Sequence, residues 1–274
     1  MDKATWGGVV LGVGGIMGGL LLEGGRLSQV LQPTAAMIVF GGTAGAVLIQ
    51  FPLPVVGKAV RYLALVFFQP KRDPSAMVQE LVRFAKQARR EGIVSLDAEL
   101  DQIREPFLKK SLMLAVDGTE PQELRSMMEL EMNNQAEHED RIPQVFESAG
   151  GFSPTIGIIG AVMGLIQVMQ HLDKIDEVGR GIAVAFVATI YGVGSANLFF
   201  LPSAGKLRTR IREEQVLREM TLEGVVSILE GMNPRMLETK LIGFLPEDKS
   251  NKQSPATAGV PSETPEKANA ASQS

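Results

Sequence analysis

The sequence contains no cysteine, and only two of its 274 residues are histidine. Without thiols the chain can form neither a disulfide framework nor a thiolate metal site, and it cannot use cysteine as a covalent catalyst. Two histidines are too few for a histidine-rich metal site unless carboxylates join them. We therefore predict no metal site and no bound cofactor.

Catalytic signatures are missing as well. The chain has no His-Glu-x-x-His, Gly-x-Gly-Asp, Gly-x-Ser-x-Gly or Walker motif, which are patterns that mark several classes of enzyme. Its long apolar stretches hold no acid, base or thiol at mid-membrane depth that could replace such a motif. We predict that the protein is not an enzyme and has no nucleic-acid partner.

Long uncharged runs are what the sequence does have. The chain is 45% hydrophobic with a mean hydropathy of +0.11, which averages apolar membrane segments and a charged remainder. Between Ser148 and Gly205 two runs of about 25 residues lack Lys, Arg, Asp and Glu, and this length is enough to cross ~30 Å of hydrocarbon. The stretch predicts a membrane hairpin with spans at about 148–172 and 182–204.

Small residues recur at helical spacing on both halves of this hairpin, where they let two helix backbones approach closely. They are Gly157, Gly160 and Gly164 in the first half and Ala185, Ala188, Thr189 and Gly192 in the second. Neither half has an acid or a base near mid-bilayer. If the hairpin lines an ion path, the group that takes up the ion must therefore come from another chain.

Two further spans are predicted near the N-terminus, at about 4–22 and 34–53, within a first hairpin of residues 1–57. The first follows only a short N-region and lacks a small-x-small cleavage site, so it is predicted to be a retained span rather than a signal peptide. Its seven glycines include several Gly-x-x-x-Gly pairs, which favour close helix packing. We expect these two spans to form a tight hairpin.

The remaining segments are more polar. Residues 58–147 predict a helical domain, because apolar positions recur at helical spacing without strand alternation, and turn signals near Gly92 and Gly118 divide it into three or four helices. Residues 206–245 predict one more helix. Residues 246–274 are too poor in apolar side chains to form a core and are predicted to be disordered. The helical positions in the domain are Met77, Leu81, Phe84, Ala88, Ile103, Phe107, Leu108 and Leu112.

Basic residues beside the spans predict the orientation, because cytoplasmic loops carry an excess of Lys and Arg. With four spans, one side receives Lys58, Arg61, Lys71, Arg72, Lys206, Arg208, Arg210 and Arg212, and the opposite loops hold only Arg26, Lys174 and Arg180. Both termini and the large loop are therefore predicted to be cytoplasmic. The predicted fold class is an all-α membrane protein with four transmembrane helices in two hairpins and a large helical cytoplasmic domain between the second and third.

Several segments of the chain resemble the MotA/TolQ/ExbB proton channel family over about residues 1–245. They are "ARREGIVSLDAEL", "FSPTIGIIGAVMGLI", "AFVATIYGV" and "FFLPSAG". Two spans, a large loop and two more spans is the order found in the flagellar stator subunits of this family, whereas ExbB and TolQ have three spans and a large loop after the first. The resemblance therefore implies a subunit of a flagellar motor stator.

In such a stator, a homopentamer of this subunit surrounds a dimer of MotB. MotB supplies the proton-binding aspartate and the peptidoglycan anchor, and the complex converts proton flow into torque on the rotor protein FliG. The resemblance thus implies MotB, FliG, further copies of this chain and membrane lipid as partners. It also implies a multi-pass location in the bacterial inner membrane.

The resemblance also implies which residues meet the rotor. Counting from Gly92, the family's rotor-binding arginine falls on Arg89 and its acid on Asp97. The family pattern has Glu at the second position, so the carboxylate reaches less far in this chain. By composition alone, these residues would be a solvated charged surface, where an ion pair contributes only about 0–1 kcal/mol.

On the ion pathway, the resemblance implies roles for Thr189 and Pro154, with Pro154 and Pro202 as conformational hinges. Ala161 and Ala188 stand where sodium-driven relatives carry threonines. Two oxygen ligands that a hard cation such as sodium requires are thus missing, and protons are the expected ion.

Simpler interpretations of some residues stay open. Pro154 falls in the first turn of its predicted span, where proline is tolerated because its missing N–H has no helical partner. The hydroxyl of Thr189 could bond a carbonyl of its own helix. His171 and Glu23, at the rim opposite the basic residues, are interpreted as interfacial polar groups without a role in proton transfer.

Three other functions remain beside that of a proton-driven stator. The closest is an ExbB/TolQ-like energiser of outer-membrane processes, which differs in span number. The second is a sodium-driven, PomA-like stator. The third is a purely structural scaffold, which would give no proton flux when expressed with MotB.

Overall fold

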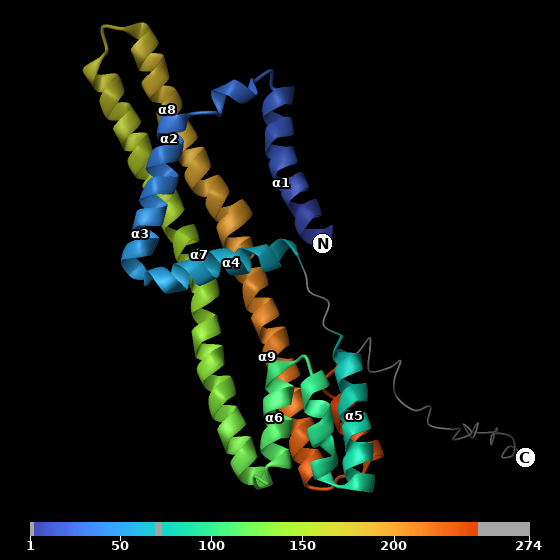
Figure 1. Cartoon of the computed structure of the whole chain (residues 1–274). Coiled ribbons are helices and arrows are strands. Elements are labelled where there is room, and N and C mark those ends of the chain that lie inside the picture. The colour runs from blue at the N-terminus through green and yellow to red at the C-terminus, as the bar shows by residue number, and fades with distance from the viewer. Residues whose placement is uncertain (1–2, 69–72, 246–274) are drawn as a thin grey trace, which may run out of the picture. The chain divides into compact units, whose positions relative to one another are not determined.

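Helices make up the fold throughout the residues that the computed structural model describes, 3–68 and 73–245 (Figure 1). In chain order they are α1 (Lys3–Leu22), η1 (Leu27–Gln29), α2 (Pro33–Ala36), η2 (Met37–Gly41), α3 (Gly42–Gln50), α4 (Leu53–Phe67), α5 (Pro74–Glu91), η3 (Ile93–Gln102), α6 (Pro106–Val116), α7 (Pro121–Gln170), α8 (Ile175–Ser195), η4 (Ala196–Phe200), α9 (Leu201–Leu229) and α10 (Pro234–Ile242). η1 and η3 are 3-10 helices, and η2 and η4 are short π-helical segments. No strand occurs in these ranges, and the predicted all-α class is confirmed.

Four helical segments are long and apolar enough to cross a membrane, which confirms the predicted number of spans. They are Lys3–Leu22, Pro33–Gln50, Pro121–Gln170 and Ile175–Leu229. The second ends at Gln50, because Phe51 is extended ahead of Pro52. The third and fourth continue far beyond their apolar stretches, so the predicted boundaries at 147/148 and 205/206 fall inside continuous helices.

The described chain divides into two compact units, neither of which is continuous in sequence. The first comprises residues 3–68 and 125–219, and the second 73–124 and 220–245. α7 and α9 each contribute to both. The predicted disordered tail, 246–274, and the basic residues Lys71 and Arg72 lie outside the described residues.

Two apolar clusters hold the first unit together. One joins α2 and η2 to α8 through Ala35, Val39, Val184, Val187 and Ala188. The other joins α3 and α4 to α7 and α9, and α4 lies across these two longer helices in Figure 1. Its buried members are Val47, Ala59, Val66, Ile142, Val145, Phe146, Ala149, Ala204 and Leu207. The second span thus packs on the fourth span rather than on the first.

The expected tight packing between the first two spans is wrong for the described structure. A Cβ added at six of the seven glycines of α1 would meet no atom within 4 Å, and only Gly12 faces a neighbour, the side chain of Leu198. The reason is that α2 uses its own apolar face against α8, while the ten residues between α1 and α2 are enough to separate the two helices. The glycine-rich face of α1 is left open (Figure 1).

The beginning of α1 is attached elsewhere. Thr5 Oγ1 donates a hydrogen bond to the carbonyl oxygen of Val66 in α4 at 3.3 Å, and Lys206 Nζ of α9 donates to Thr5 Oγ1. The rings of Trp6 and Phe67 are 5.6 Å apart. These contacts place the first turn of α1 beside the basic stretch that starts at Lys206.

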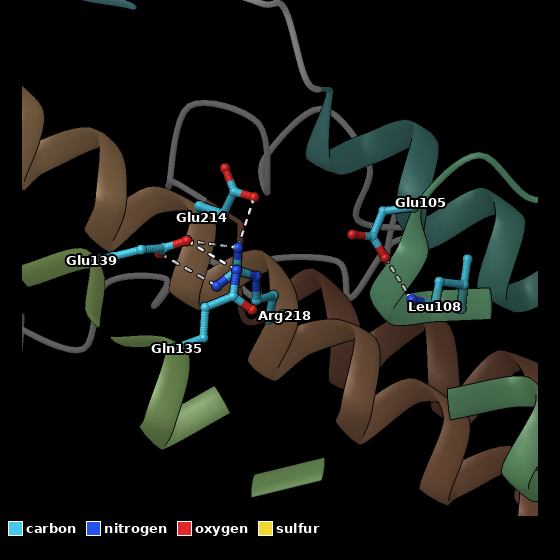
Figure 2. A network of polar contacts seen from close by, with 6 residues as sticks. All are labelled: Glu105, Leu108, Gln135, Glu139, Glu214 and Arg218. Carbon is cyan, nitrogen blue, oxygen red and sulfur yellow. Dashed lines mark hydrogen bonds and ion pairs between the residues drawn. The ribbon is translucent and has the colours of Figure 1, made fainter. Parts of the chain in front are cut away.

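The second unit has a core of its own, and its helices begin at positions that the sequence marks. Asp73, Glu105 and Asn233 each accept a backbone N–H with the side chain and each precede a proline, which favours a helix start. Figure 2 shows the bond from Leu108 to Glu105. The largest fully buried side chains of this unit are Phe84, Leu81, Leu96, Leu108, Leu112, Leu124, Met220, Leu237 and Leu241.

Candidate functional site

The third and fourth spans meet backbone to backbone. A Cβ built on Gly157 of α7 would lie 2.9 Å from the carbonyl oxygen of Ala188. One built on Gly192 of α8 would lie 2.6 Å from the carbonyl oxygen of Ser153. Real Cβ atoms essentially never come closer than 3.0 Å, so only glycine fits at this crossing. The predicted close approach of the two helices is confirmed.

A pair of hydroxyl groups lies beside this glycine contact. Ser153 Oγ of α7 and Ser195 Oγ of α8 are 2.7 Å apart, and Ser195 Oγ also donates to the carbonyl oxygen of Gly192 at 3.3 Å. Ser153 has no exposed surface. Because a buried hydroxyl is unfavourable without a partner, this bond stabilises one register of α7 against α8.

The two α8 residues that the resemblance assigns to the ion pathway differ in exposure. Ala188 is fully buried and lies against Gly160. Thr189 is half-buried, and its hydroxyl donates to the carbonyl oxygen of Ala185 at 3.3 Å. Thr189 therefore makes the intrahelical bond that the sequence also allows, while part of its side chain stays at the surface of the chain. Its role on the pathway stays a prediction.

Because Ala188 is buried, replacing it with threonine is expected to lower the stability of the protein. A Cβ on Gly160 would already lie 2.8 Å from the Cβ of Ala188, so Ala188→Thr overfills this contact and should destabilise the protein by about 1–3 kcal/mol. Ala161→Thr is the matched control, because Ala161 is only half-buried. The midpoint of thermal unfolding in detergent measures both variants. Equal midpoints for the two would show that the contact at Ala188 can relax.

The two prolines lie in different helical settings. Pro154 is deep inside α7 rather than in a first turn; the helix starts at Pro121, and nothing in between ends it. The first-turn interpretation of Pro154 is therefore wrong, and the proline removes one hydrogen bond from a continuous helix. Pro202 is exposed and is the second residue after the π-helical η4, where the N–H of Leu201 donates to the carbonyl oxygen of Ala196. Such π-helical segments occur at bends and functional sites.

Tyr191 of α8 is a contact residue that sequence reasoning missed. Its hydroxyl donates to the carbonyl oxygen of Val30 at 2.6 Å and accepts from the N–H of Gln32 at 3.3 Å. Its ring stacks on Phe40 with centroids 5.9 Å apart. These bonds satisfy the backbone just before α2 and bind it to α8. The sequence did offer one signal: Tyr191 is a lone tyrosine in an apolar run, and a buried tyrosine hydroxyl needs a hydrogen-bond partner.

The turn between α7 and α8 carries a small polar cluster. His171 Nε2 is 3.3 Å from Glu177 Oε2, and Lys174 Nζ is 3.1 Å from Glu177 Oε1. Glu23 is exposed. In the described ranges, no group of three or more His, Cys, Asp or Glu side chains is placed to hold a metal ion.

A charged turn of the second unit carries both predicted rotor-binding residues. Arg89 is exposed in the last turn of α5, and Asp97 is exposed in η3. Gly92 between them has a φ of 84°, a conformation that side-chain-bearing residues rarely adopt, and it ends α5. Two bonds hold η3 against α5: Arg83 pairs with Glu99 at 2.9 Å, and Gln87 Nε2 donates to the carbonyl oxygen of Ser95 at 3.2 Å.

Comparison with known proteins agrees with this arrangement. Residues 99–220 match the MotA/TolQ/ExbB proton channel family, and residues 6–92 match the Motility protein A N-terminal family. Motility protein A of Bacillus subtilis is 35% identical over 250 residues, which cover 90% of this chain and 92% of the relative. The chain belongs to the MotA/TolQ/ExbB proton channel family.

Two solved structures of stator complexes share the fold. The structure of C. jejuni MotAB has a TM-score of 0.86 at 33% identity, covering 90% of this chain and 97% of the matched chain. The flagellar MotAB stator complex from Bacillus subtilis has a TM-score of 0.84 at 33% identity, covering 92% and 100%. The resemblance to stator subunits of the MotA/TolQ/ExbB family is thus confirmed over nearly the whole chain.

Each family match includes some of the candidate residues. The N-terminal match includes Arg89, and the MotA/TolQ/ExbB match includes Pro154, Thr189 and Pro202. Asp97 falls in the short gap between the matches. Arg89 therefore lies within a family match and Asp97 does not, and contact of either residue with a rotor stays a prediction.

Proposed function

We propose that this chain is the subunit of a proton-driven flagellar stator, which together with MotB converts proton flow into torque on the rotor. The observation that carries this proposal is the pairing of α7 with α8 through glycines, with no Lys, Arg, Asp or Glu in either apolar stretch, in a fold shared with two MotAB complexes. Such a hairpin can form the wall of a pathway, but it cannot take up the proton itself.

A carboxylate of MotB would supply the missing group. Protonation neutralises a charge that is unfavourable inside the membrane, so the MotB helix can shift against the faces of α7 and α8, and release on the other side restores the charge. Each proton delivers ~2.3 kcal/mol per 100 mV of membrane potential. This free energy drives stepwise movement of the subunits around MotB.

The ion is a proton rather than sodium. Sodium needs several oxygen ligands, and the chain has Ala161 and Ala188 where sodium-driven relatives carry threonines. The burial of Ala188 against Gly160 adds to this argument, because that position offers no surface to an ion within the chain.

The assembly would be a pentamer of this chain around a MotB dimer. Open apolar surface supports further helix partners: among the described residues, a Cβ added at six of the seven α1 glycines would meet no atom within 4 Å, and one side of α7 is exposed. The exposed α7 side chains are Ile158, Ile159, Val162, Met163, Leu165, Ile166 and Met169. Neighbouring copies, MotB and lipid would cover these surfaces.

The protein would lie in the bacterial inner membrane with both termini in the cytoplasm, where the charged turn of Arg89 and Asp97 would meet FliG. The attachment of Thr5 to α4 and to Lys206 supports this orientation, because it brings the N-terminal turn to the basic side. A tag on the N-terminus should be protected from a protease added to the periplasm. Digestion of the tag would instead support an ExbB/TolQ-like energiser.

The decisive experiment is proton flux in vesicles that contain this chain with and without MotB. Flux should require MotB and its membrane aspartate, and Thr189→Ala should lower it by about tenfold if the hydroxyl takes part in proton transfer. Thr209→Ala, outside the membrane stretch, is the matched control, since that hydroxyl also bonds its own helix, at Gly205. Flux from this chain without MotB would contradict the proposal.

A further inference from the structure

One ion pair of the first unit is buried. Of the charged residues that the structure describes, only Glu139 of α7 and Arg218 of α9 are buried, with exposed fractions of 5% and 7%. They are 79 residues apart in sequence. The pair therefore joins two helices that the chain brings together only on folding.

The geometry around Arg218 is shown in Figure 2. Its Nη1 and Nη2 lie 3.4 and 3.3 Å from the two carboxylate oxygens of Glu139, and Nη2 also lies 3.0 Å from Glu214 Oε1. Gln135 Nε2 donates to Glu139 Oε1 at 2.9 Å. Glu139 thus receives bonds from both helices, and the guanidinium is shared between two carboxylates. Such a fork fixes both the distance and the orientation of the partners.

Electrostatics agree with this arrangement. Burial alone would lower the pKa of Arg218, but the charges and hydrogen bonds of Glu139 and Glu214 raise it above its ordinary value. Tyr62 of α4 lies within the same field: burial, and then the charges of Glu139 and Glu214, raise the pKa of its hydroxyl. The guanidinium therefore stays charged, and the phenol stays neutral, at any physiological pH.

The pair lies at a defined distance from the two prolines of the membrane hairpin. Glu139 precedes Pro154 by 15 residues and Arg218 follows Pro202 by 16, which is about 22–24 Å along each helix. Between the prolines and the pair, α7 and α9 are joined by the apolar cluster with α4. Beyond the pair, both helices continue into the second unit.

Stability alone does not explain a buried ion pair. Removing two charges from water is unfavourable, and replacing such a pair by apolar side chains is often neutral or stabilising, whereas its best-attested use is to specify one register. Apolar contacts are non-directional, whereas a charged fork requires its donors and acceptors at fixed positions. A fork at the end of an apolar cluster therefore restricts how far one helix can shift along the other.

We propose that the Glu139–Arg218 pair positions α7 and α9 in one register below the membrane hairpin, so that a movement of the hairpin passes down both helices as one body. This inference rests on the proposed stator function. It predicts that loss of the pair separates two activities that are normally coupled: protons still flow through the complex with MotB, but less torque is produced.

The test uses the full chain expressed with MotB, with torque measured from tethered-cell rotation and proton flux measured in vesicles. Two variants are compared: Glu139→Gln, and the apolar double variant Glu139→Leu with Arg218→Met, which leaves no buried charge of this pair unpaired. Both should keep flux within about twofold of the unmodified protein and lower torque by about fivefold or more, if a register held by the pair carries the movement.

Glu137→Gln is the control, because it removes the same charge from an exposed pair with Arg141 on the same helix, and it should change neither activity. Wild-type torque in the double variant would overturn the proposal, and so would failure of both variants to accumulate, since the pair would then act on folding alone. Absence of flux in the unmodified complex would instead reject the stator function itself.

Discussion

Replacing Gly192 with leucine should prevent the membrane hairpin from forming. A Cβ at this position would lie 2.6 Å from the carbonyl oxygen of Ser153 and 3.2 Å from the Cα of Pro154. Both are backbone atoms of α7, which cannot rotate away as a side chain could. The variant must push two spans apart and lose the Ser153–Ser195 bond, so we expect a loss of at least about 3 kcal/mol, the upper end for overpacking.

Accumulation in the membrane and the midpoint of thermal unfolding in detergent measure this effect. Gly194→Leu is the matched control, because it places the same side chain on the same helix where an added Cβ meets nothing within 4 Å. The control should unfold near the midpoint of the unmodified protein. Similar losses in both variants would indicate that leucine is harmful at any α8 glycine and that the backbone contact is not the cause.

Arg89→Glu should abolish motility while the protein still accumulates and conducts protons with MotB. Arg89 is exposed, so its reversal removes no packing and should change stability by less than about 0.5 kcal/mol. Against a charged partner the same reversal replaces attraction with repulsion, and close interfacial charge pairs are worth about 1.5–7 kcal/mol. The expected result is a large loss of torque without a loss of the folded complex.

Swimming in soft agar, together with proton flux in vesicles, separates these effects. Arg235→Glu makes the same charge change on an exposed site of α10 and should leave motility intact. Asp97→Lys should have a weaker effect than Arg89→Glu. Normal swimming with Arg89→Glu would remove the charged turn from the rotor interface, whereas loss of flux would mean that the residue acts on the channel.

The membrane hairpin could be predicted from sequence because its determinants are local. Two uncharged runs of membrane length define the third and fourth spans, and Gly157 and Gly192 mark where their backbones can meet. The helix starts of the second unit were equally local, since an acid or amide before a proline marks them. The position of Pro154 within its helix was mispredicted. Hydropathy indicates where the apolar stretch begins, but the helix itself begins earlier, outside the membrane.

The partners of each helix were not predictable in the same way. The glycines of α1 suggested packing on the second span, yet that span packs on α8 through Val39 and Ala188, and Tyr191 of α8 bonds the backbone just before it. Several helices have apolar faces that can pack on one another. The spacing of apolar residues along the sequence does not show which two faces pack best. The Glu139–Arg218 pair was also missed, because both residues stand in charged segments where most side chains are solvated.

The sequence by itself determined the number of membrane helices, the approximate length of their apolar stretches, and the lack of Lys, Arg, Asp and Glu in the two apolar stretches of the hairpin, because these follow from hydrophobic length and residue chemistry. It also identified the family through short motifs. Only the tertiary structure decided which helices touch, that Ala188 is enclosed while Thr189 is not, and that one charged pair is buried. These features depend on contacts between residues far apart in the chain, where the free energy of packing, and not local preference, selects the arrangement.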